Sequence, residues 1–126
     1  MPLEINEHRP GPETPEHFAR VLRDSPEARQ ALEQALEQAQ KEALESDEPR
    51  ILEGIFNARP VAMLLARRQS EGWRLECLVV HPATRGRGVG TETLRWAATL
   101  LQPLEVPATL RELAARAGTP GISIPE

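Results

Sequence analysis

Aromatic residues and cysteine are scarce in this sequence, which has two Trp, two Phe, no Tyr and one Cys among its 126 residues. The single cysteine excludes an internal disulfide and suits the reducing cytosol, so we expect a cytoplasmic protein. No apolar run approaches the ~20 residues of a transmembrane helix, and we expect no secretory signal. A formal net charge of −4 disfavours non-specific binding of nucleic acids. Because aromatic residues are so few, the core must be built mostly from Leu, Val, Ile and Ala.

Two common nucleotide-binding motifs are missing from the glycine-rich stretch of the chain. Its glycines fall at positions 86, 88 and 90. No Gly-Lys-Ser or Gly-Lys-Thr follows them, which excludes a Walker-type loop. Their spacing also differs from the Gly-x-Gly-x-x-Gly register of dinucleotide-binding folds. A turn without a ligand is the alternative, but it would give up backbone entropy at three glycines without any gain in binding.

This glycine-rich loop joins an apolar strand to an amphipathic helix. The pattern predicts a strand at Trp73–Val80, a connection at His81–Thr84 and Arg85–Gly90, and a helix at Thr91–Leu101. Glycines let successive backbone N–H groups point into one concavity, and a helix start adds unpaired N–H donors and a positive dipole end. We therefore expect the loop to bind a phosphate or pyrophosphate.

The rest of the chain predicts further helices and strands within one domain, residues 1–126. Thr14-Pro15-Glu16 and Ser25-Pro26-Glu27 each have the form of a helix start, a capping hydroxyl followed by Pro and an acid. Ala and Leu then recur at steps of three and four, which predicts a long amphipathic helix ending near Glu45. The other expected elements are a short helix at 15–23, strands at Leu3–Asn6, Arg50–Phe56, Val61–Arg68, Leu104–Val106 and Ile122–Ile124, and a last helix that begins at Ala108 or Thr109 and is capped by Gly118. Four-residue turns between the three middle strands are typical of an antiparallel meander. An open sheet edge and the alanine-rich helix leave monomer and homodimer as alternatives.

The glycine loop resembles the acetyl-CoA motif of the GCN5-related N-acetyltransferases, the GNAT superfamily. That motif, Gln/Arg-x-x-Gly-x-Gly/Ala after a strand, is filled here by Arg85, Gly88 and Gly90, and Leu78–Pro82 is typical of the approach to it. The resemblance implies an α+β fold with a mostly antiparallel sheet of about six strands flanked by helices. It also implies a truncated C-terminus, because no residues remain for the seventh strand that usually closes the sheet. The implied ligand is acetyl-CoA or CoA.

The same resemblance assigns residues to this ligand. Backbone groups near Leu78 and Val80 would pair with the amides of the pantetheine arm, in a gap where two strands splay apart. The pyrophosphate would be held by backbone N–H groups of Arg85, Gly86, Arg87, Gly88, Val89 and Gly90. The two arginine side chains would add positive charge near the 3′-phosphate.

Binding this ligand does not by itself imply catalysis, because acetyl transfer also needs a base for the amine and an acid for the thiolate. The usual acid of the family is a tyrosine, which this chain lacks, and Thr109 in the corresponding stretch is a poor substitute. Glu76 is the candidate base if it is buried beside the cleft. The alternative for Glu76 is a partly exposed or ion-paired carboxylate.

The cysteine and the histidines are expected to have structural roles. Cys77 alternates to the opposite face from its neighbours in the strand, and it is expected to be a small buried residue, because a nucleophile would want a nearby histidine. His81 is expected on the surface of the loop. His8 and His17 have no partner carboxylate or cysteine at ligand spacing, so no metal site is predicted.

A closer resemblance is to the PanZ-type acetyl-CoA sensors, the maturation factors of bacterial aspartate decarboxylase. It lies within about residues 50–100, in Arg50-Ile51, Phe56-Asn57-x-Arg59, Leu75-Glu76-Cys77-Leu78-x-Val80 and the glycine loop. It implies a regulator in pantothenate and CoA synthesis that senses acetyl-CoA and acts on the decarboxylase precursor, with Asn57 and Arg59 on a partner-facing turn. The alternative for these two residues is plain turn chemistry. The alternative function is an N-acetyltransferase for a small amine or a peptide amine, so whether the protein is an enzyme stays open at this point.

Overall fold

The computed structural model describes residues 3–42, 49–84 and 86–124. The strands are β1 (Glu4–His8), β2 (Arg50–Phe56), β3 (Arg59–Gln69), β4 (Gly72–Val80), β5 (Leu104–Glu105) and β6 (Ile122–Ser123). The helices are α1 (Thr14–His17), α2 (Ala19–Leu22), α3 (Pro26–Glu42), α4 (Val89–Leu100) and α5 (Arg111–Ala117), with short 3-10 turns at Pro82–Thr84 and Ala108–Leu110. No helix in these ranges is both long and apolar enough to cross a membrane. The predicted helix end near Glu45 and the loop residue Arg85 lie outside the described residues.

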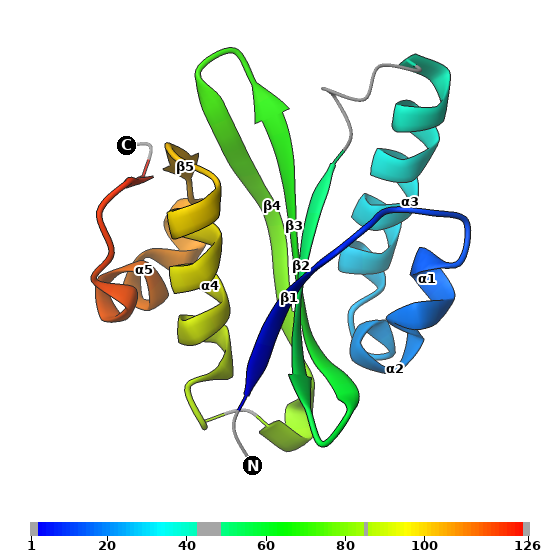
Figure 1. Cartoon of the computed structure of the whole chain (residues 1–126), viewed down its shortest axis with the longest axis horizontal. Coiled ribbons are helices and arrows are strands. Elements are labelled where there is room, and N and C mark those ends of the chain that lie inside the picture. The colour runs from blue at the N-terminus through cyan, green and yellow to red at the C-terminus, as the bar shows by residue number, and fades with distance from the viewer. Residues whose placement is uncertain (1–2, 43–48, 85, 125–126) are drawn as a thin grey trace.

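The strands form one sheet in the order β1-β2-β3-β4-β5-β6. The strands from β1 to β4 pair antiparallel, and β5 and β6 extend the sheet in parallel pairing. Helices α1, α2 and α3 cover one face of the sheet, and α4 and α5 cover the other (Figure 1). The predicted α+β fold, a mostly antiparallel sheet of about six strands flanked by helices, is confirmed.

The predicted meander of β2, β3 and β4 is present, but its strands run further than expected. Only Asn57-Ala58 separates β2 from β3, and only Ser70-Glu71 separates β3 from β4. Asn57 and Ala58 have φ angles of 54° and 63°, the left-handed pair of a type I′ turn, whose twist matches that of antiparallel strands. The predicted four-residue turns are therefore wrong, because ladder pairing continues into both of them.

Two apolar clusters pack on opposite faces of the central strands. The cluster under α4 and α5 includes Leu52, Leu64, Ala66, Leu94 and Leu101, and the cluster under α1, α2 and α3 includes Phe18, Leu22, Ile51, Met63 and Leu65. Alternate residues of β3 enter both clusters, so Val61–Ala66 is buried throughout, as expected for a strand covered on both faces. Within the described ranges, Phe18 and Met63 are the only non-aliphatic members of the buried core, which agrees with the scarcity of aromatic residues.

The N-terminal helices differ from the prediction in two respects. The expected helix at 15–23 is divided at Phe18, whose backbone (φ −101°, ψ 12°) is not helical and whose side chain is fully buried. Thr14 is the first residue of α1 rather than its cap. Its Oγ1 instead accepts the Gly11 N–H at 2.8 Å and lies 3.1 Å from His8 Nε2. The burial of Phe18 and the side-chain hydrogen bonds of Thr14 thus override the local helix-start signal.

Candidate functional site

A cleft runs along β4 beyond the point where β5 ends. Among the described residues, β4 pairs with β5 only at Trp73↔Leu104 and Arg74↔Glu105, although β4 continues to Val80. A hollow of about 470 Å³ lies beside the second half of β4 and is bounded by the glycine loop and by α5. Its volume is in the range of sites for small organic ligands. β4 and β5 therefore separate beyond Arg74 and Glu105, as expected, but α5 rather than β5 forms the other wall of the hollow.

A β-bulge in β4 decides which side chains face this cleft. Glu76 is the extra residue of the bulge, because its neighbours Leu75 and Cys77 are paired with consecutive residues of β3. The bulge shifts the alternation by one residue, so that Leu75 and Leu78 both pack in the cluster under α4 while Cys77 packs on the opposite face. The predicted opposition of Cys77 and Leu78 is confirmed. Glu76 is exposed rather than buried, which agrees with the alternative of a partly exposed carboxylate.

The loop between β4 and α4 presents backbone rather than side chains to the cleft. Gly86 and Gly88 have φ angles of 83° and 79°, left-handed values that favour glycine, and a Cβ on either would meet no atom within 4 Å. Gly90 has no left-handed φ. A Cβ there would lie 3.4 Å from Val80 Cγ2 and 3.7 Å from both Cδ atoms of Leu113, at the wall of the cleft. Backbone conformation therefore explains Gly86 and Gly88 but not Gly90.

The start of α4 places hydrogen-bond donors at the same end of the cleft. The helix begins at Val89, not at the predicted Thr91, because Gly88 is its N-cap. The Gly88 carbonyl accepts the Glu92 N–H at 3.0 Å, so the N–H groups of the preceding turn have no acceptor within the helix. An anion in the cleft would meet these donors and the positive end of the helix dipole.

A cation from the last helix also borders the cleft. Arg116 of α5 is among its lining residues, and the Arg95 Nε of α4 donates to the Ala117 carbonyl at 3.1 Å, which ties the two helices together. Of the arginines expected here, Arg87 is exposed on the loop and Arg85 lies outside the described residues. Arg116 was not among the predicted residues, because the apolar stripe of its helix predicts that the helix packs but not against which element.

The thiol of Cys77 is not prepared for nucleophilic chemistry. Burial, together with the neighbouring Glu76 carboxylate, raises the pKa of the Cys77 thiol from its ordinary value of 9.0 to about 12. The thiol is therefore protonated at neutral pH, and a protonated thiol is a poor nucleophile. These properties support the structural role expected for Cys77.

The backbone and ring of His81 hold the turn that leads into the glycine loop. Its N–H donates to the Val61 carbonyl at 2.7 Å, and its Nδ1 accepts the Ala83 N–H at 3.1 Å. Its carbonyl accepts the Thr84 hydroxyl at 3.0 Å. His81 thus has the structural place on the loop that its sequence context favoured.

The β2–β3 turn lies beside a second hollow, of about 350 Å³. Asn57 and Arg59 are both exposed, and they line this hollow together with Arg20 and Thr84. Thr84 also borders the main cleft. The turn is therefore accessible to a partner, and one residue connects its surroundings with the cleft.

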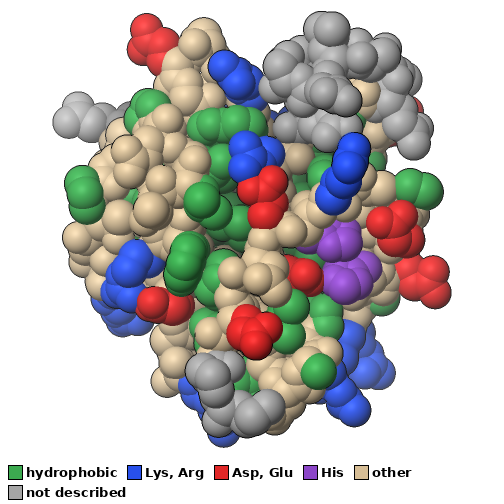
Figure 2. Space-filling model, in the orientation of Figure 1, with side chains coloured by type: hydrophobic (Ala, Val, Ile, Leu, Met, Phe, Trp, Pro, Cys, Tyr) green, Lys and Arg blue, Asp and Glu red, His purple; other side chains and the backbone are tan. Residues whose placement is uncertain are grey.

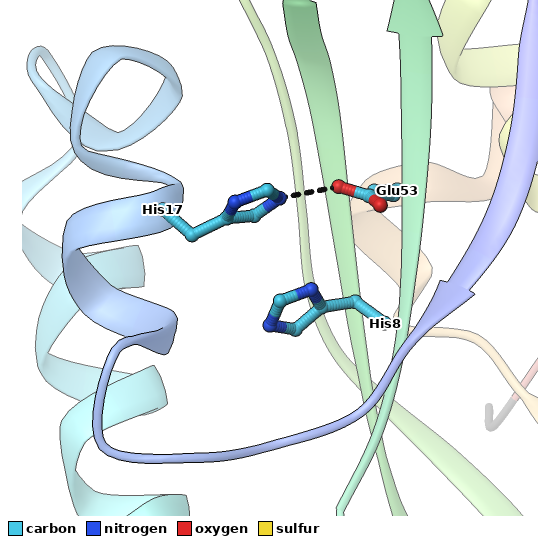
Figure 3. Close-up of side chains that lie close together, drawn as sticks. All are labelled: His8, His17 and Glu53. Carbon is cyan, nitrogen blue, oxygen red and sulfur yellow. Dashed lines mark hydrogen bonds and ion pairs between the residues drawn. The ribbon is translucent and has the colours of Figure 1, made fainter.

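The fold also brings together three residues that are distant in sequence. His8 ends β1, His17 ends α1 and Glu53 lies in β2; one ring nitrogen of each histidine and one carboxylate oxygen lie within 4.8 Å of one another (Figure 3). The expectation that neither histidine has a partner carboxylate is wrong, because His17 Nε2 lies 2.6 Å from Glu53 Oε2. The sequence spacing could not show this, since His17 of α1 and Glu53 of β2 are 36 residues apart and meet only in the folded chain.

Comparisons with known proteins agree with this geometry. The sequence profile of the acetyltransferase (GNAT) family matches residues 15–117. Among solved structures, a GNAT-family protein from Desulfovibrio desulfuricans superimposes with a TM-score of 0.61 at 12% identity, over 78% of this chain and 65% of its own. An aminoglycoside 6′-N-acetyltransferase complexed with coenzyme A gives 0.54 at 20% identity, over 90% of this chain and 56% of its own. A GNAT acetyltransferase from Brucella melitensis in complex with acetyl-CoA gives 0.55 at 14% identity, over 97% and 74%.

At these identities the structural likeness concerns the fold alone. The chain covers less than two thirds of the length of the first two of these proteins. Comparison with curated protein sequences finds no match.

Proposed function

Because the chain belongs to the acetyltransferase (GNAT) family, we propose that it binds acetyl-CoA in the cleft beside β4 and transfers the acetyl group to an amine. The observation that carries this proposal is the meeting of two features at one place. The second half of β4, which extends beyond its pairing with β5, borders a cleft, and the cleft ends at a glycine loop and a helix start that favour a bound anion. A CoA thioester needs both, a channel for its arm and a cradle for its pyrophosphate.

The residues of the cleft fit this ligand part by part. The backbone around Leu78 and Val80 would pair with the pantetheine amides, as the family resemblance implies. The N–H groups from Gly88 to Gly90 would hold the pyrophosphate, and the missing Cβ of Gly90 leaves the wall of the cleft open to it. Arg116 would supply the positive charge that the sequence analysis assigned to the arginines of the loop.

The coenzyme supplies an acetyl thioester, whose carbonyl carbon bonds to the amine nitrogen while the bond to the CoA sulfur breaks. The amine must lose a proton and the departing thiolate must gain one. Glu76 is exposed and is not among the residues that line the cleft, so it would accept the amine proton through an intervening water. The chain has no tyrosine and Thr109 is exposed, so water would protonate the thiolate.

Thermal unfolding with acetyl-CoA, with CoA and with buffer alone tests binding, and thiol release with an amine panel tests transfer. We expect acetyl-CoA to raise the melting temperature by linkage and thiol release to depend on the amine. Glu76→Gln should lower kcat by about 10²-fold. Glu71→Gln, another exposed glutamate on the adjacent turn, is the matched control. An unchanged melting temperature would refute the site, and thiol release that no amine alters would refute the transfer.

A second candidate, a PanZ-type regulator, is favoured by the surface next to the cleft. Asn57 and Arg59 are exposed there, and Thr84 borders both their hollow and the cleft. Occupation of the cleft would therefore favour one arrangement of the partner-facing turn. The absence of tyrosine also fits a protein that binds acetyl-CoA as a signal.

Binding of a bacterial aspartate decarboxylase precursor, with and without acetyl-CoA, tests this second candidate. Capture should require the ligand and should be lost in Arg59→Ala. Arg68→Ala, which removes an exposed arginine from the same strand, should leave capture unchanged. Capture that does not depend on acetyl-CoA, or no capture at all, would exclude the regulator.

A further inference from the structure

We propose that His8, His17 and Glu53 form a binding site for a divalent transition metal ion, with Zn²⁺ as the ion whose chemistry they match. Two imidazoles and one glutamate are a donor set that zinc proteins use, with the remaining coordination position left to water. The site shares no residue with the cleft beside β4, so it does not depend on the proposed acetyl transfer.

The three side chains converge from three separate elements onto one point (Figure 3). Their ligand atoms lie within 4.8 Å of one another, and the His17 Nε2–Glu53 Oε2 pair is already at 2.6 Å. Ligands around a tetrahedral zinc ion, at bond lengths of about 2.0–2.2 Å, are roughly 3.3 Å apart. Moderate side-chain rotations, without movement of the backbone, would therefore bring all three onto one ion.

The ring of His8 is oriented as a metal ligand requires. Its Nε2 lies 3.1 Å from the Thr14 hydroxyl, and that hydroxyl is fully buried and fixed by the Gly11 N–H at 2.8 Å. This bond leaves Nδ1 on the side of His17 and Glu53 (Figure 3). A ligand histidine is characteristically held by such a hydrogen bond at its other nitrogen. The Thr14 hydroxyl, which was expected to cap a helix, holds the His8 ring instead.

Burial and charge favour the same interpretation. Glu53 is 8% exposed, and a carboxylate in such a place needs a cation or strong donors beside it. The rings of His8 and His17 stack with centroids 4.5 Å apart.

The cluster is also accessible to an ion and to water. The His17 side chain is 36% exposed, and histidine side chains reach the surface of this face together, with acidic side chains beside them (Figure 2). An ion entering here would keep an open coordination position toward solvent. It would also link β1, α1 and β2, and so hold the N-terminal strand and helix to the sheet.

Titration of the metal-free, untagged chain with ZnCl₂ tests the proposal by calorimetry and by competition with a chromogenic chelator. We expect one zinc ion per chain and a rise of the melting temperature as zinc is added. His17→Gln, at an exposed position, and Glu53→Gln, which keeps the shape of the buried side chain, should each weaken zinc binding at least tenfold. His81→Gln removes a histidine outside the cluster and should leave the affinity unchanged.

The metal-free melting curve of each variant shows whether it is folded before zinc is added. Weaker zinc binding by both folded cluster variants, together with unchanged binding by His81→Gln, supports the site. Zinc binding that survives both cluster substitutions, or no binding by the unmodified chain at micromolar zinc, would overturn the proposal. The cluster would then be only a hydrogen-bonded pair of His17 and Glu53.

Discussion

The substitution Gly90→Ala tests whether the fold or a bound ligand requires glycine at position 90. The added Cβ would lie 3.4 Å from Val80 Cγ2 and 3.7 Å from the Leu113 Cδ atoms, which are ordinary van der Waals contacts. Gly90 is the second residue of α4, and alanine in a helix is favoured over glycine by roughly 0.5–1 kcal/mol. The substitution should therefore stabilise the unliganded protein.

The expected change can be given as a melting temperature. With an unfolding entropy of about 2.1 cal/mol/K per residue, a chain of this size should gain about 2–4 °C. The same methyl group would stand in the wall of the cleft, where the pyrophosphate must approach the backbone. Differential scanning fluorimetry should therefore show a higher melting temperature without acetyl-CoA and a smaller increase on adding it.

Gly88→Ala is the matched control, because its effect on stability has the opposite sign. Its Cβ would meet no atom within 4 Å, but φ is 79°, which costs a non-glycine residue roughly 1–2 kcal/mol. This variant should melt several degrees lower. A Gly90→Ala protein that keeps the full acetyl-CoA shift would refute the assigned ligand position. One that melts several degrees lower without ligand would refute the packing argument.

Three further perturbations test the cleft, the core and the thiol. Arg116→Gln should weaken acetyl-CoA binding several-fold at low salt and less at high salt. Arg111→Gln, which changes an exposed arginine of the same helix outside the cleft lining, should leave binding unchanged. Equal effects of the two substitutions would show that Arg116 does not belong to the site. Leu64→Ala empties a fully buried position and should lower the free energy of unfolding by about 2–5 kcal/mol in urea, and a loss below 1 kcal/mol would contradict the described core. The pKa of the Cys77 thiol is raised from 9.0 to about 12, so the protonated thiol makes its full contribution to the free energy of unfolding below pH 9. This contribution is lost as pH rises toward 12, by at most about 1.4 kcal/mol per pH unit. The chain has no tyrosine and one lysine, so few other groups titrate there, and Cys77→Ser should flatten this dependence in urea unfolding measured from pH 8 to 11.

Much of the fold could be predicted from short stretches of the sequence, without any tertiary information. Apolar strands separated by turn residues predicted the meander, and the strand, glycine loop and helix in succession predicted the anion-binding end of the cleft. Gly118 was expected as a helix cap and has the left-handed φ of 58° that this position requires. These features were predictable because hydrogen bonds and backbone angles within a few neighbouring residues decide them.

Pairing between distant segments decided the rest. The bulge that exposes Glu76 depends on its register against β3, and a single inserted residue leaves no mark in the periodicity of one strand. Arg116 lies at the cleft because α5 packs beside α4. The helix predicted at 15–23 is interrupted at Phe18, whose side chain is buried in the core.

The sequence by itself therefore determined that a glycine loop with an anion-binding helix start follows an apolar strand. Only the tertiary structure decided which side chains surround that loop, and only it placed His8 and His17 beside Glu53. The physical reason is that chain spacing sets the geometry within an element, whereas sheet register and helix packing set the distances between elements.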